Sequence, residues 1–246
     1  SMGPPSSGGI VLGQILKMIE PYDLSSYDHN SLEYIQLLVE AQRRSFADRG
    51  KYLGDPDFNY IPVNELLKKE YLNNRMDSFT FEKSTPSNLI SYGKFDFNES
   101  EETTHYSIVD KFGNAVSVTT TLNGNYGSKL FPSDLGFFLN NEMDDFSIKP
   151  GSPNMYGLIG GEINSIEPNK RMLSSMTPTI VEKNNKLFLV LGSPGGPTII
   201  TSVLQTILKS EEFKFSIDKA VYSQRFHHLY LPDYIYSEKI ILKKAR

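Results

Sequence analysis

The apolar residues of the N-terminal third recur at helical spacing and predict three amphipathic helices. The first spans residues 9–20 and is stopped by Pro21. The second spans residues 31–49. A third helix is expected from Pro62 onward, because proline is favoured in the first turn of a helix. The residues predicted to face inward are Ile10, Val11, Ile15, Met18 and Ile19 in the first helix, Leu32, Ile35, Val39 and Phe46 in the second, and Val63, Leu66, Leu67 and Tyr71 in the third.

Two β-rich runs in the middle of the chain predict an antiparallel hairpin. They cover His105–Asp110 and Ala115–Leu122, and the loop Lys111–Asn114 between them carries the glycine and asparagine that tight reversals need. Pairing outward from this loop brings position 103 opposite position 121, 122 or 123, depending on how many residues the turn takes. We therefore expect Thr121 to lie beside Thr103.

A second hairpin is predicted further along the chain. Its strands are Thr179–Glu182 and Leu187–Leu191, and they are joined through Asn184 and Asn185. The second strand is apolar throughout, so we expect it to be buried on both faces.

A glycine-rich turn follows this strand. The turn is Gly192-Ser193-Pro194-Gly195-Gly196, and apolar residues then recur at helical spacing between Ile199 and Leu208. A strand, a glycine turn and a helix in this order leave free backbone N–H groups at the start of the helix. A further short helix is predicted from the N-cap Ser216 to about Gln224.

Composition narrows the classes of function. The 25 basic and 29 acidic residues give a net charge of −4, so no overall field attracts nucleic acid or an anionic membrane. The absence of cysteine excludes disulfides, cysteine nucleophiles and thiolate metal sites, and it leaves the redox compartment open. No signal segment is evident, and no apolar run approaches the roughly 20 residues that span a bilayer. Small solutes are the expected partners.

A polar linker divides the chain into two regions. Residues 73–102 have little periodicity and are rich in Ser, Thr, Asn, Asp and Glu, which is typical of an exposed connection. The region 1–102 is expected to be mainly helical up to this linker. The region 103–246 contains both predicted hairpins.

Thr103 stands where the linker ends and the first hairpin begins. A threonine in this position is ordinary in itself, because threonine is a good strand former. It becomes a nucleophile if the chain is cut immediately before it, since its own α-amino group can then act as the base. An α-amine titrates near pH ~7.7 to 8.0, which suits this work at neutral pH.

Several longer motifs follow one another in a fixed order. In the second region they are Thr103-Thr104-His105-Tyr106-Ser107, Asp110-Lys111-Phe112-Gly113-Asn114-Ala115-Val116, Thr119-Thr120-Thr121-Leu122-Asn123, Asn140-Asn141-Glu142-Met143-Asp144-Asp145-Phe146, Pro168-Asn169-Lys170-Arg171-Met172-Leu173-Ser174-Ser175-Met176 and the glycine turn. In the first region they are Pro4-Pro5-Ser6-Ser7-Gly8-Gly9, Ala47-Asp48-Arg49 and Leu53-Gly54-Asp55-Pro56-Asp57. Over nearly the whole chain these motifs resemble γ-glutamyltranspeptidases, at the end of the large subunit and the start of the small one. Because the chain opens inside one motif and stops before the last part of a family small subunit, we expect a fragment.

The resemblance implies a fold and a reaction. The fold is α+β, the four-layer αββα sandwich of the N-terminal-nucleophile hydrolases, incomplete in this chain. The Thr103 hydroxyl would attack the Glu102 carbonyl and cut the chain between these two residues. The freed Thr103 would attack a γ-glutamyl amide such as glutathione and pass the γ-glutamyl group to water or to the amine of an amino acid or peptide. No cofactor is implied.

The resemblance also implies a partner and a location. The remainder of the large subunit would complete the protein, which would lie in a periplasm or outside the cell. In the family an arginine from the earlier part of the large subunit grips the substrate α-carboxylate, and that part is absent from this chain. Two alternatives stay open: an acylase or a poly-γ-glutamate-processing enzyme on the same scaffold, and a catalytically inert, unprocessed fragment.

The residues around the nucleophile receive roles from the resemblance. Thr121 would orient Thr103, although the two also make an ordinary cross-strand pair. The amides of Gly195 and Gly196 would form an oxyanion hole. Because the glycine turn lacks the spacing and the lysine of a P-loop, nucleotide binding is discounted.

The γ-glutamyl end of the substrate is a zwitterion, so the site must satisfy one ammonium and one carboxylate. The resemblance implies that Asn123, Glu142 and Asp145 accept from the ammonium. It implies that the hydroxyls of Ser174 and Ser175 donate to the carboxylate. The alternatives are a solvated acidic turn for the carboxylates and a turn cap for the serines.

A loop and a histidine pair complete the candidates. Lys149–Gly161 resembles the lid loop of bacterial members, with Tyr156 placed to contact Asn123, although composition alone favours an ordinary surface loop. His227 and His228 are adjacent and have no third ligand at metal-binding spacing. We therefore expect surface or packing histidines and no metal site.

Overall fold

The computed structural model describes residues 1–90 and 103–238. Its helices are α1 (Gly8–Ile19), α2 (Leu32–Tyr52), α3 (Val63–Leu66), α4 (Lys69–Met76), α5 (Thr198–Glu211) and α6 (Ile217–Tyr222). Its strands are β1 (Thr104–Val109), β2 (Ala115–Thr120), β3 (Thr179–Lys183), β4 (Lys186–Leu191), β5 (Phe226–His227) and β6 (Tyr236–Ser237). The described strands pair into antiparallel two-stranded sheets, β1–β2, β3–β4 and β5–β6.

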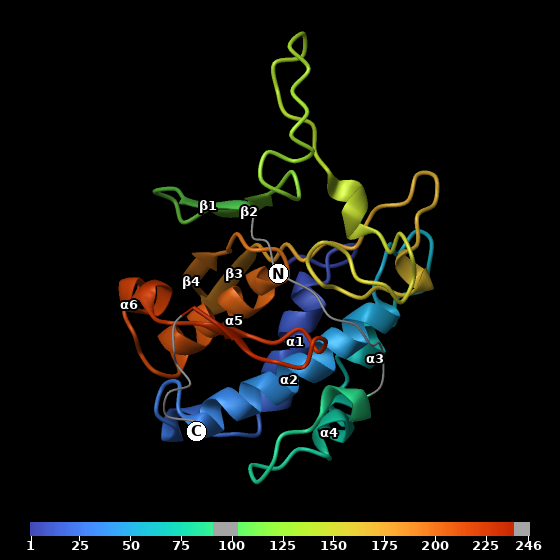
Figure 1. The fold of residues 1–246 in the computed structure, drawn as a ribbon. Coiled ribbons are helices and arrows are strands. Elements are labelled where there is room, and N and C mark those ends of the chain that lie inside the picture. Colours follow the sequence, from blue (N-terminus) through green and yellow to red (C-terminus); the bar gives the residue numbers. More distant parts are fainter. Residues whose placement is uncertain (91–102, 239–246) are drawn as a thin grey trace.

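The hydrophobic core lies among α1, α2 and α5, which pack side by side (Figure 1). The inward stripe predicted for the first helix is buried throughout, from Ile10 to Ile19. In α2 the prediction fails only at Leu32, which is 52% exposed because it lies in the first turn, before the helix enters the core. Within the described residues, every helix is too short or too polar to cross a lipid bilayer.

The predicted third helix is two helices in the structure. α3 ends at Leu66, and Lys68 is already extended, with ψ 134°, before α4 begins. Leu66 and Leu72 are both buried, although six residues at about 100° each put them on different faces of one continuous helix. The break turns both leucines towards the core, which a single helix cannot do.

The first hairpin has the predicted position, and its register is one of the three that the sequence left open. Thr104 pairs with Thr120, and the amide of Asp110 donates to the carbonyl of Asn114 at 3.0 Å across a turn of three residues. Gly113 in this turn has φ +87°, a left-handed conformation that glycine adopts without steric cost. The turn length therefore fixes which residues face each other along β1 and β2.

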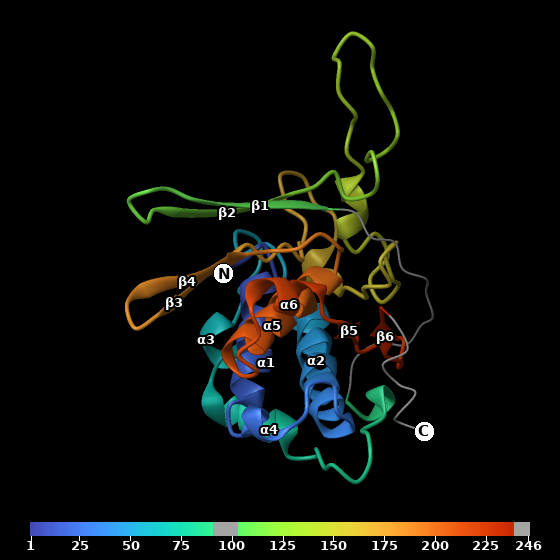
Figure 2. The same cartoon turned by 90° about the vertical axis from the view of Figure 1, so that its left-hand side faces the viewer.

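The second hairpin also forms as predicted, but its burial was predicted wrongly. Asn184 and Asn185 make the turn, with φ +53° and +58°. On β4, Leu187 and Phe188 are each 37% exposed, and only Leu191 at the far end is buried. The tip of the hairpin projects beyond the helices in Figure 2, so the helices do not cover the apolar residues near the turn.

The hairpins and helices are stacked in layers. β1–β2 lies above β3–β4, and the helices lie below (Figure 1). Serine hydroxyls join the two hairpins, because Ser107 Oγ donates to the carbonyl of Val190 and Ser117 Oγ to that of Leu191, each at 3.0 Å. The fold class is α+β, as expected. Among the described residues no helix lies outside β1–β2, so the four-layer sandwich is incomplete in this chain.

Between β2 and the following 3-10 helix, residues 124–141 form a long arm that extends away from the body (Figures 1 and 2). Its two sides are held together by backbone bonds, including one from the amide of Leu139 to the carbonyl of Leu130 at 3.0 Å. Phe131 and Phe137 are more than half exposed on this arm, at 52% and 55%. The arm thus presents aromatic side chains outward.

Candidate active site

A narrow cavity of about 20 Å³ collects most of the residues predicted to act on substrate. Its wall includes Thr103, Thr121, Asn123, Asp145, Tyr156, Ser174, Ser175 and Gly196. They come from the open end of the first hairpin, the 3-10 helix η3 (Glu142–Asp145), two loops and the turn before α5. Glu142 and Gly195 are close in sequence to wall residues but do not line the cavity, and Glu102 lies outside the described residues.

The two threonines lie at the same cavity. The register that pairs Thr104 with Thr120 continues outward to Thr103 and Thr121, and both of these line the cavity. Thr121 Oγ1 accepts a hydrogen bond from the amide of Asn123 at 2.9 Å. Asn123 has φ +73° and is buried, so the chain leaves the hairpin in a sharp, fixed turn at this point.

Tyr156 covers the cavity from the Lys149–Gly161 loop. Its hydroxyl donates to the backbone carbonyl of Asn123 at 2.5 Å, and the side chain is 3% exposed. A Cβ at Gly196 would come within 2.9 Å of its ring, so the ring lies directly against the glycine turn. The predicted contact between Tyr156 and Asn123 is therefore present, and this tyrosine is not part of an ordinary surface loop.

The glycine turn before α5 leaves two backbone amides available. Gly195 and Gly196 have φ +122° and +48°, conformations that favour glycine. Their carbonyls accept from the amides of Thr198 and Ile199 at 2.9 and 3.2 Å. Within residues 1–90 and 103–238, the amides of the two glycines donate to no protein acceptor. The turn can therefore offer N–H groups to an anion at the cavity.

The hydroxyls of Ser174 and Ser175 are arranged as donors. Ser174 Oγ accepts from the amide of Met176 at 3.1 Å, and Ser175 Oγ accepts from Nη2 of Arg49 at 3.1 Å. Neither hydroxyl donates to an acceptor in the described part of the chain. Because a hydroxyl has one hydrogen to donate, each serine keeps it available at the cavity wall.

The segment Pro4–Gly9 holds these serines in place. The amide of Ser7 donates to the carbonyl of Ser174 at 2.9 Å, and the amide of Ser174 donates to the carbonyl of Pro5 at 3.1 Å. The segments run parallel and close together, since a Cβ at Gly8 would lie 2.5 Å from the carbonyl of Met176. Sequence reasoning gave this motif no role, although its two glycines were a signal of close backbone approach.

The acidic residues of η3 have perturbed ionisation. Burial raises the pKa of Asp145 to about 7, Arg49 opposes this rise, and Glu142 and Asp144 add to it. Burial also raises the pKa of Glu142. The carboxylate of Asp145 is therefore not part of a fully solvated acidic turn, and an ammonium placed beside it would favour its charged form.

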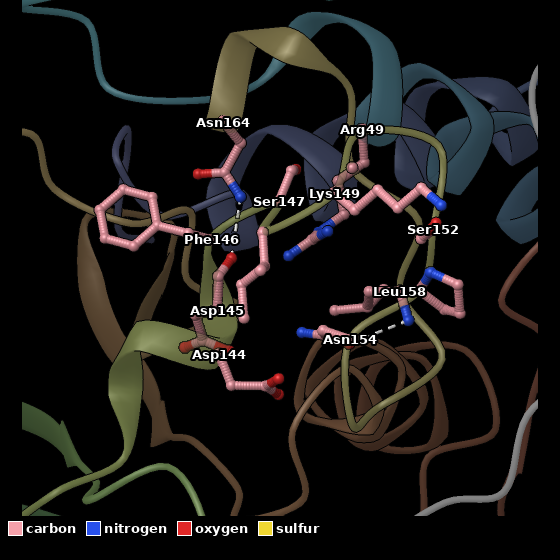
Figure 3. A pocket seen from close by; sticks show the side chains of 13 residues that line it. Arg49, Asp144, Asp145, Phe146, Ser147, Lys149, Ser152, Asn154, Leu158 and Asn164 are labelled. Atoms are coloured by element: carbon pink, nitrogen blue, oxygen red, sulfur yellow. Dashed lines mark hydrogen bonds between the residues drawn. The ribbon is translucent and has the colours of Figure 1, made fainter. Parts of the chain in front are cut away.

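Arg49 connects this site to a second cavity, of about 240 Å³, shown in Figure 3. Arg49 reaches into it from α2, Asp144 and Asp145 line it from η3, and Lys149 lines it from the start of the Lys149–Gly161 loop (Figure 3). Burial lowers the pKa of Arg49 to about 10, while Asp145 acts in the opposite direction. Sequence reasoning missed this residue, whose only signal was its place in the Ala47-Asp48-Arg49 motif.

The histidine pair packs in the interior and is not at the surface. His227 and His228 are 3% and 0% exposed. Nε2 of His228 lies 3.2 Å from Asp233 and 3.3 Å from Nη2 of Arg43. No group of three or more potential metal ligands occurs among the described residues.

Comparison with known proteins shows the family. The chain matches the family described as Gamma-glutamyltranspeptidase over residues 1–245. It is 49% identical over 239 residues to the glutathione hydrolase proenzyme of Escherichia coli K12, covering 97% of this chain and 41% of that protein. It therefore spans about two fifths of the length of this relative.

Solved structures give the same result. A mutant of Helicobacter pylori gamma-glutamyltranspeptidase matches with 60% identity and a TM-score of 0.55, over 56% of this chain and 74% of that chain. Cephalosporin acylase from Bacillus halodurans, at 20% identity, shares the fold with a TM-score of 0.72, over 92% of this chain and 38% of that one. The chain described here belongs to the gamma-glutamyltranspeptidase family.

Proposed function

We propose that this chain carries the catalytic site of a self-processing γ-glutamyltransferase and glutathione hydrolase. The observation that carries the proposal is the single cavity that joins the paired threonines, the glycine turn, two hydroxyl donors and an acidic side chain. Membership of the family supports the type of reaction. Because the chain spans about two fifths of its E. coli relative, the activity of the whole protein is part of the proposal.

The first proposed step is cleavage before Thr103. The Thr103 hydroxyl attacks the carbonyl carbon of Glu102, the peptide C–N bond breaks, and the Thr103 nitrogen takes up the proton, which leaves an ester. Water then hydrolyses the ester to a Glu102 carboxylate and a Thr103 hydroxyl with a free α-amine. The two pieces would be 1–102, the end of the large subunit, and 103–246, most of the small subunit.

The second proposed step is transfer of the γ-glutamyl group. The α-amine of Thr103 accepts the hydroxyl proton while the oxygen attacks the γ-carbonyl carbon of the substrate. The amides of Gly195 and Gly196 stabilise the oxyanion, and Thr121 orients the nucleophile. The leaving amine departs with the proton, and an acyl-enzyme ester remains. Water or an acceptor amine then attacks this ester and restores the Thr103 hydroxyl.

Recognition of the substrate zwitterion supplies the specificity. Ser174 and Ser175 donate to the α-carboxylate, which matches their available hydroxyl hydrogens. Asp145 accepts from the α-ammonium, and Glu142 and Asn123 assist it. Because burial raises the pKa of Asp145 to about 7, its charged form depends on pH near neutrality and is favoured by the bound ammonium.

The remainder of the large subunit is the proposed protein partner. Ile108 and Val109 on β1 are 56% and 51% exposed. Phe131 and Phe137 on the arm are exposed to a similar degree. Exposed apolar surface of this kind supports a partner that covers it. The family arginine that grips the α-carboxylate is expected from that partner. A periplasmic or extracellular location stays a prediction from family membership.

The test uses the whole protein that contains this sequence. Thr103→Ala is expected to leave a single uncut species by intact-mass measurement. It is also expected to reduce hydrolysis of γ-glutamyl-p-nitroanilide by on the order of a thousandfold or more. Thr103→Ser keeps a hydroxyl and an α-amine, so it should still cut and turn over.

Thr104→Ala is the matched control, because Thr104 is the neighbouring, exposed threonine of β1. It should cut and turn over as the wild type does. Cleavage of Thr103→Ala at the same bond would contradict the assignment of the nucleophile. A wild-type protein that stays uncut after long incubation would favour the inert alternative.

A further inference from the structure

Arg49 stands directly behind the substrate cavity and has no role in the reaction described above. It lies near the end of α2, and its side chain is 3% exposed. It lines the second cavity from one side, while Asp145 lines it from η3 (Figure 3). It does not line the substrate cavity, whose wall contains both Ser175 and Asp145. Arg49 therefore bonds to Ser175 on the wall of the substrate cavity, and it lines the neighbouring cavity together with Asp145.

The hydrogen bonds of Arg49 fix the direction of two serine hydroxyls. Nη2 donates to Ser175 Oγ at 3.1 Å, and Nε donates to Ser7 Oγ at 2.9 Å. A guanidinium has donors and no acceptor, so neither hydroxyl can donate back to Arg49. Ser7 directs its hydrogen to the carbonyl of Ser174 at 2.7 Å.

The hydroxyl hydrogen of Ser175 is directed differently. Within residues 1–90 and 103–238 no protein acceptor takes it, and Ser175 stands on the wall of the substrate cavity. A hydroxyl that accepts from a cation is polarised and becomes a stronger donor through its own O–H. Arg49 thus makes Ser175 a donor towards the cavity.

Arg49 also acts on the opposite pole of the site. Its positive charge lowers the pKa of Asp145, against the burial that raises it and against the carboxylates of Glu142 and Asp144. Lys149 is the other cationic residue that lines the second cavity. Without Arg49 the carboxylate of Asp145 would need a higher pH to ionise.

We propose that Arg49 is a positioning residue of the zwitterion site, which orients the Ser175 hydroxyl towards the substrate carboxylate and places a positive charge on the cavity that it shares with Asp145, the proposed acceptor of the substrate ammonium. The inference rests on the proposed function. It implies that the preference for substrates with an α-carboxylate depends in part on a residue that does not line the substrate cavity. Hydrogen bonds to charged groups are strong enough for this discrimination to be measurable.

The experiment compares two anilides in the whole protein. One carries the γ-glutamyl group, and the other carries the γ-aminobutyryl group, which keeps the ammonium and lacks the carboxylate. Arg49→Met should lower the ratio of their kcat/KM values by on the order of tenfold to a hundredfold, through the γ-glutamyl substrate. This ratio does not depend on the fraction of folded protein, so partial unfolding of the variant does not imitate the effect.

The pH profile is a second readout that a merely structural role would not move. In Arg49→Met the acid limb of kcat/KM for the γ-glutamyl anilide should move to higher pH, because Asp145 loses the charge that favours its ionised form. Arg49→Lys keeps the charge but offers no planar pair of donors, so it should restore the acid limb and only part of the ratio.

Two further variants serve as controls. Arg43→Met removes another arginine of α2, 5% exposed, that contacts neither serine, and it should leave the ratio unchanged. Adding Arg49→Met to Ser175→Ala should lower the ratio little further, since both act through one hydroxyl. An active wild type with an unchanged ratio in Arg49→Met overturns this inference alone. A wild type that does not hydrolyse the γ-glutamyl anilide overturns the proposed function and this inference with it.

Discussion

Replacement of Asp145 by asparagine probes the electrostatics of the site through protein stability. Burial is the main reason why the pKa of Asp145 is raised from 3.8 to about 7. In the unfolded chain the same carboxyl ionises near pH ~3.9. Between about pH 4 and pH 7 the folded state therefore holds a proton that the unfolded state has released. It follows that Asp145 lowers the free energy of unfolding progressively as the pH rises through this window.

The magnitude follows from the size of this change. A pKa raised from 3.8 to about 7 corresponds to about 4 kcal/mol once the pH is above 7. This value is an upper limit, because the amide of asparagine must also be desolvated. We expect Asp145→Asn to match the wild type in stability near pH 4 and to exceed it by about 1 to 4 kcal/mol at pH 8.

The assay is urea unfolding of both proteins at unit intervals from pH 4 to pH 8. Asp144→Asn is the matched control, because it removes a carboxylate from the same 3-10 helix, one that accepts from the amide of Met155 at 2.9 Å. Because the Asp144 carboxylate adds to the raised pKa of Asp145, this control should show a gain at high pH that is clearly smaller than that of Asp145→Asn. A stability difference for Asp145→Asn that is the same at every pH, or a loss at pH 8, would refute the reasoning. The same variant should lose at least roughly tenfold in kcat/KM for the γ-glutamyl anilide, since it removes the charged acceptor.

Two further predictions concern Gly196 and Tyr156, which lie against each other at the cavity. Gly196→Ala should reduce kcat by on the order of a hundredfold, because the residue has φ +48° and its Cβ would lie 2.9 Å from the Tyr156 ring. Gly113→Ala is the control, because Gly113 also has a positive φ, +87°, but no atom lies within 4 Å of the added Cβ. This variant should lower the melting temperature and leave kcat unchanged. Tyr156→Phe removes the hydrogen bond to the carbonyl of Asn123 and should raise KM about fivefold, as steady-state kinetics would measure. The exposed Tyr126→Phe should change nothing, and equal effects of the two substitutions would contradict this account of the loop.

The features that sequence predicted correctly depend on neighbours along the chain. The stripe of α1 is buried because apolar side chains three and four residues apart share one face of a helix. The turn around Gly113 limited the register of the first hairpin to three possibilities, since turn length fixes the pairing of the strands that flank it. The observed register is one of these three, and it agrees with Thr103 and Thr121 lining one cavity.

The predictions that failed depend on what covers each element. The helix expected from Pro62 breaks in two because the core takes both Leu66 and Leu72. The apolar strand β4 is exposed near its turn because the tip of its hairpin projects beyond the helices. For the histidine pair the sequence left surface and packing positions open, and α2 decides for packing, since the amide of His228 donates to Oε1 of Gln42 at 2.9 Å. Periodicity along one element carries no information about its neighbours in space.

The amino-acid sequence by itself determined the local elements, the family resemblance and the set of residues proposed for the site. Only the tertiary structure brought Pro4–Gly9 beside Ser174 and put Arg49 behind Ser175. Arg49 and Ser175 are 126 positions apart, so their contact is decided by how α2 packs against a distant loop and not by any spacing in the chain. Tertiary packing also set the ionisation of Asp145, because burial is what raises its pKa and burial is a property of the folded molecule.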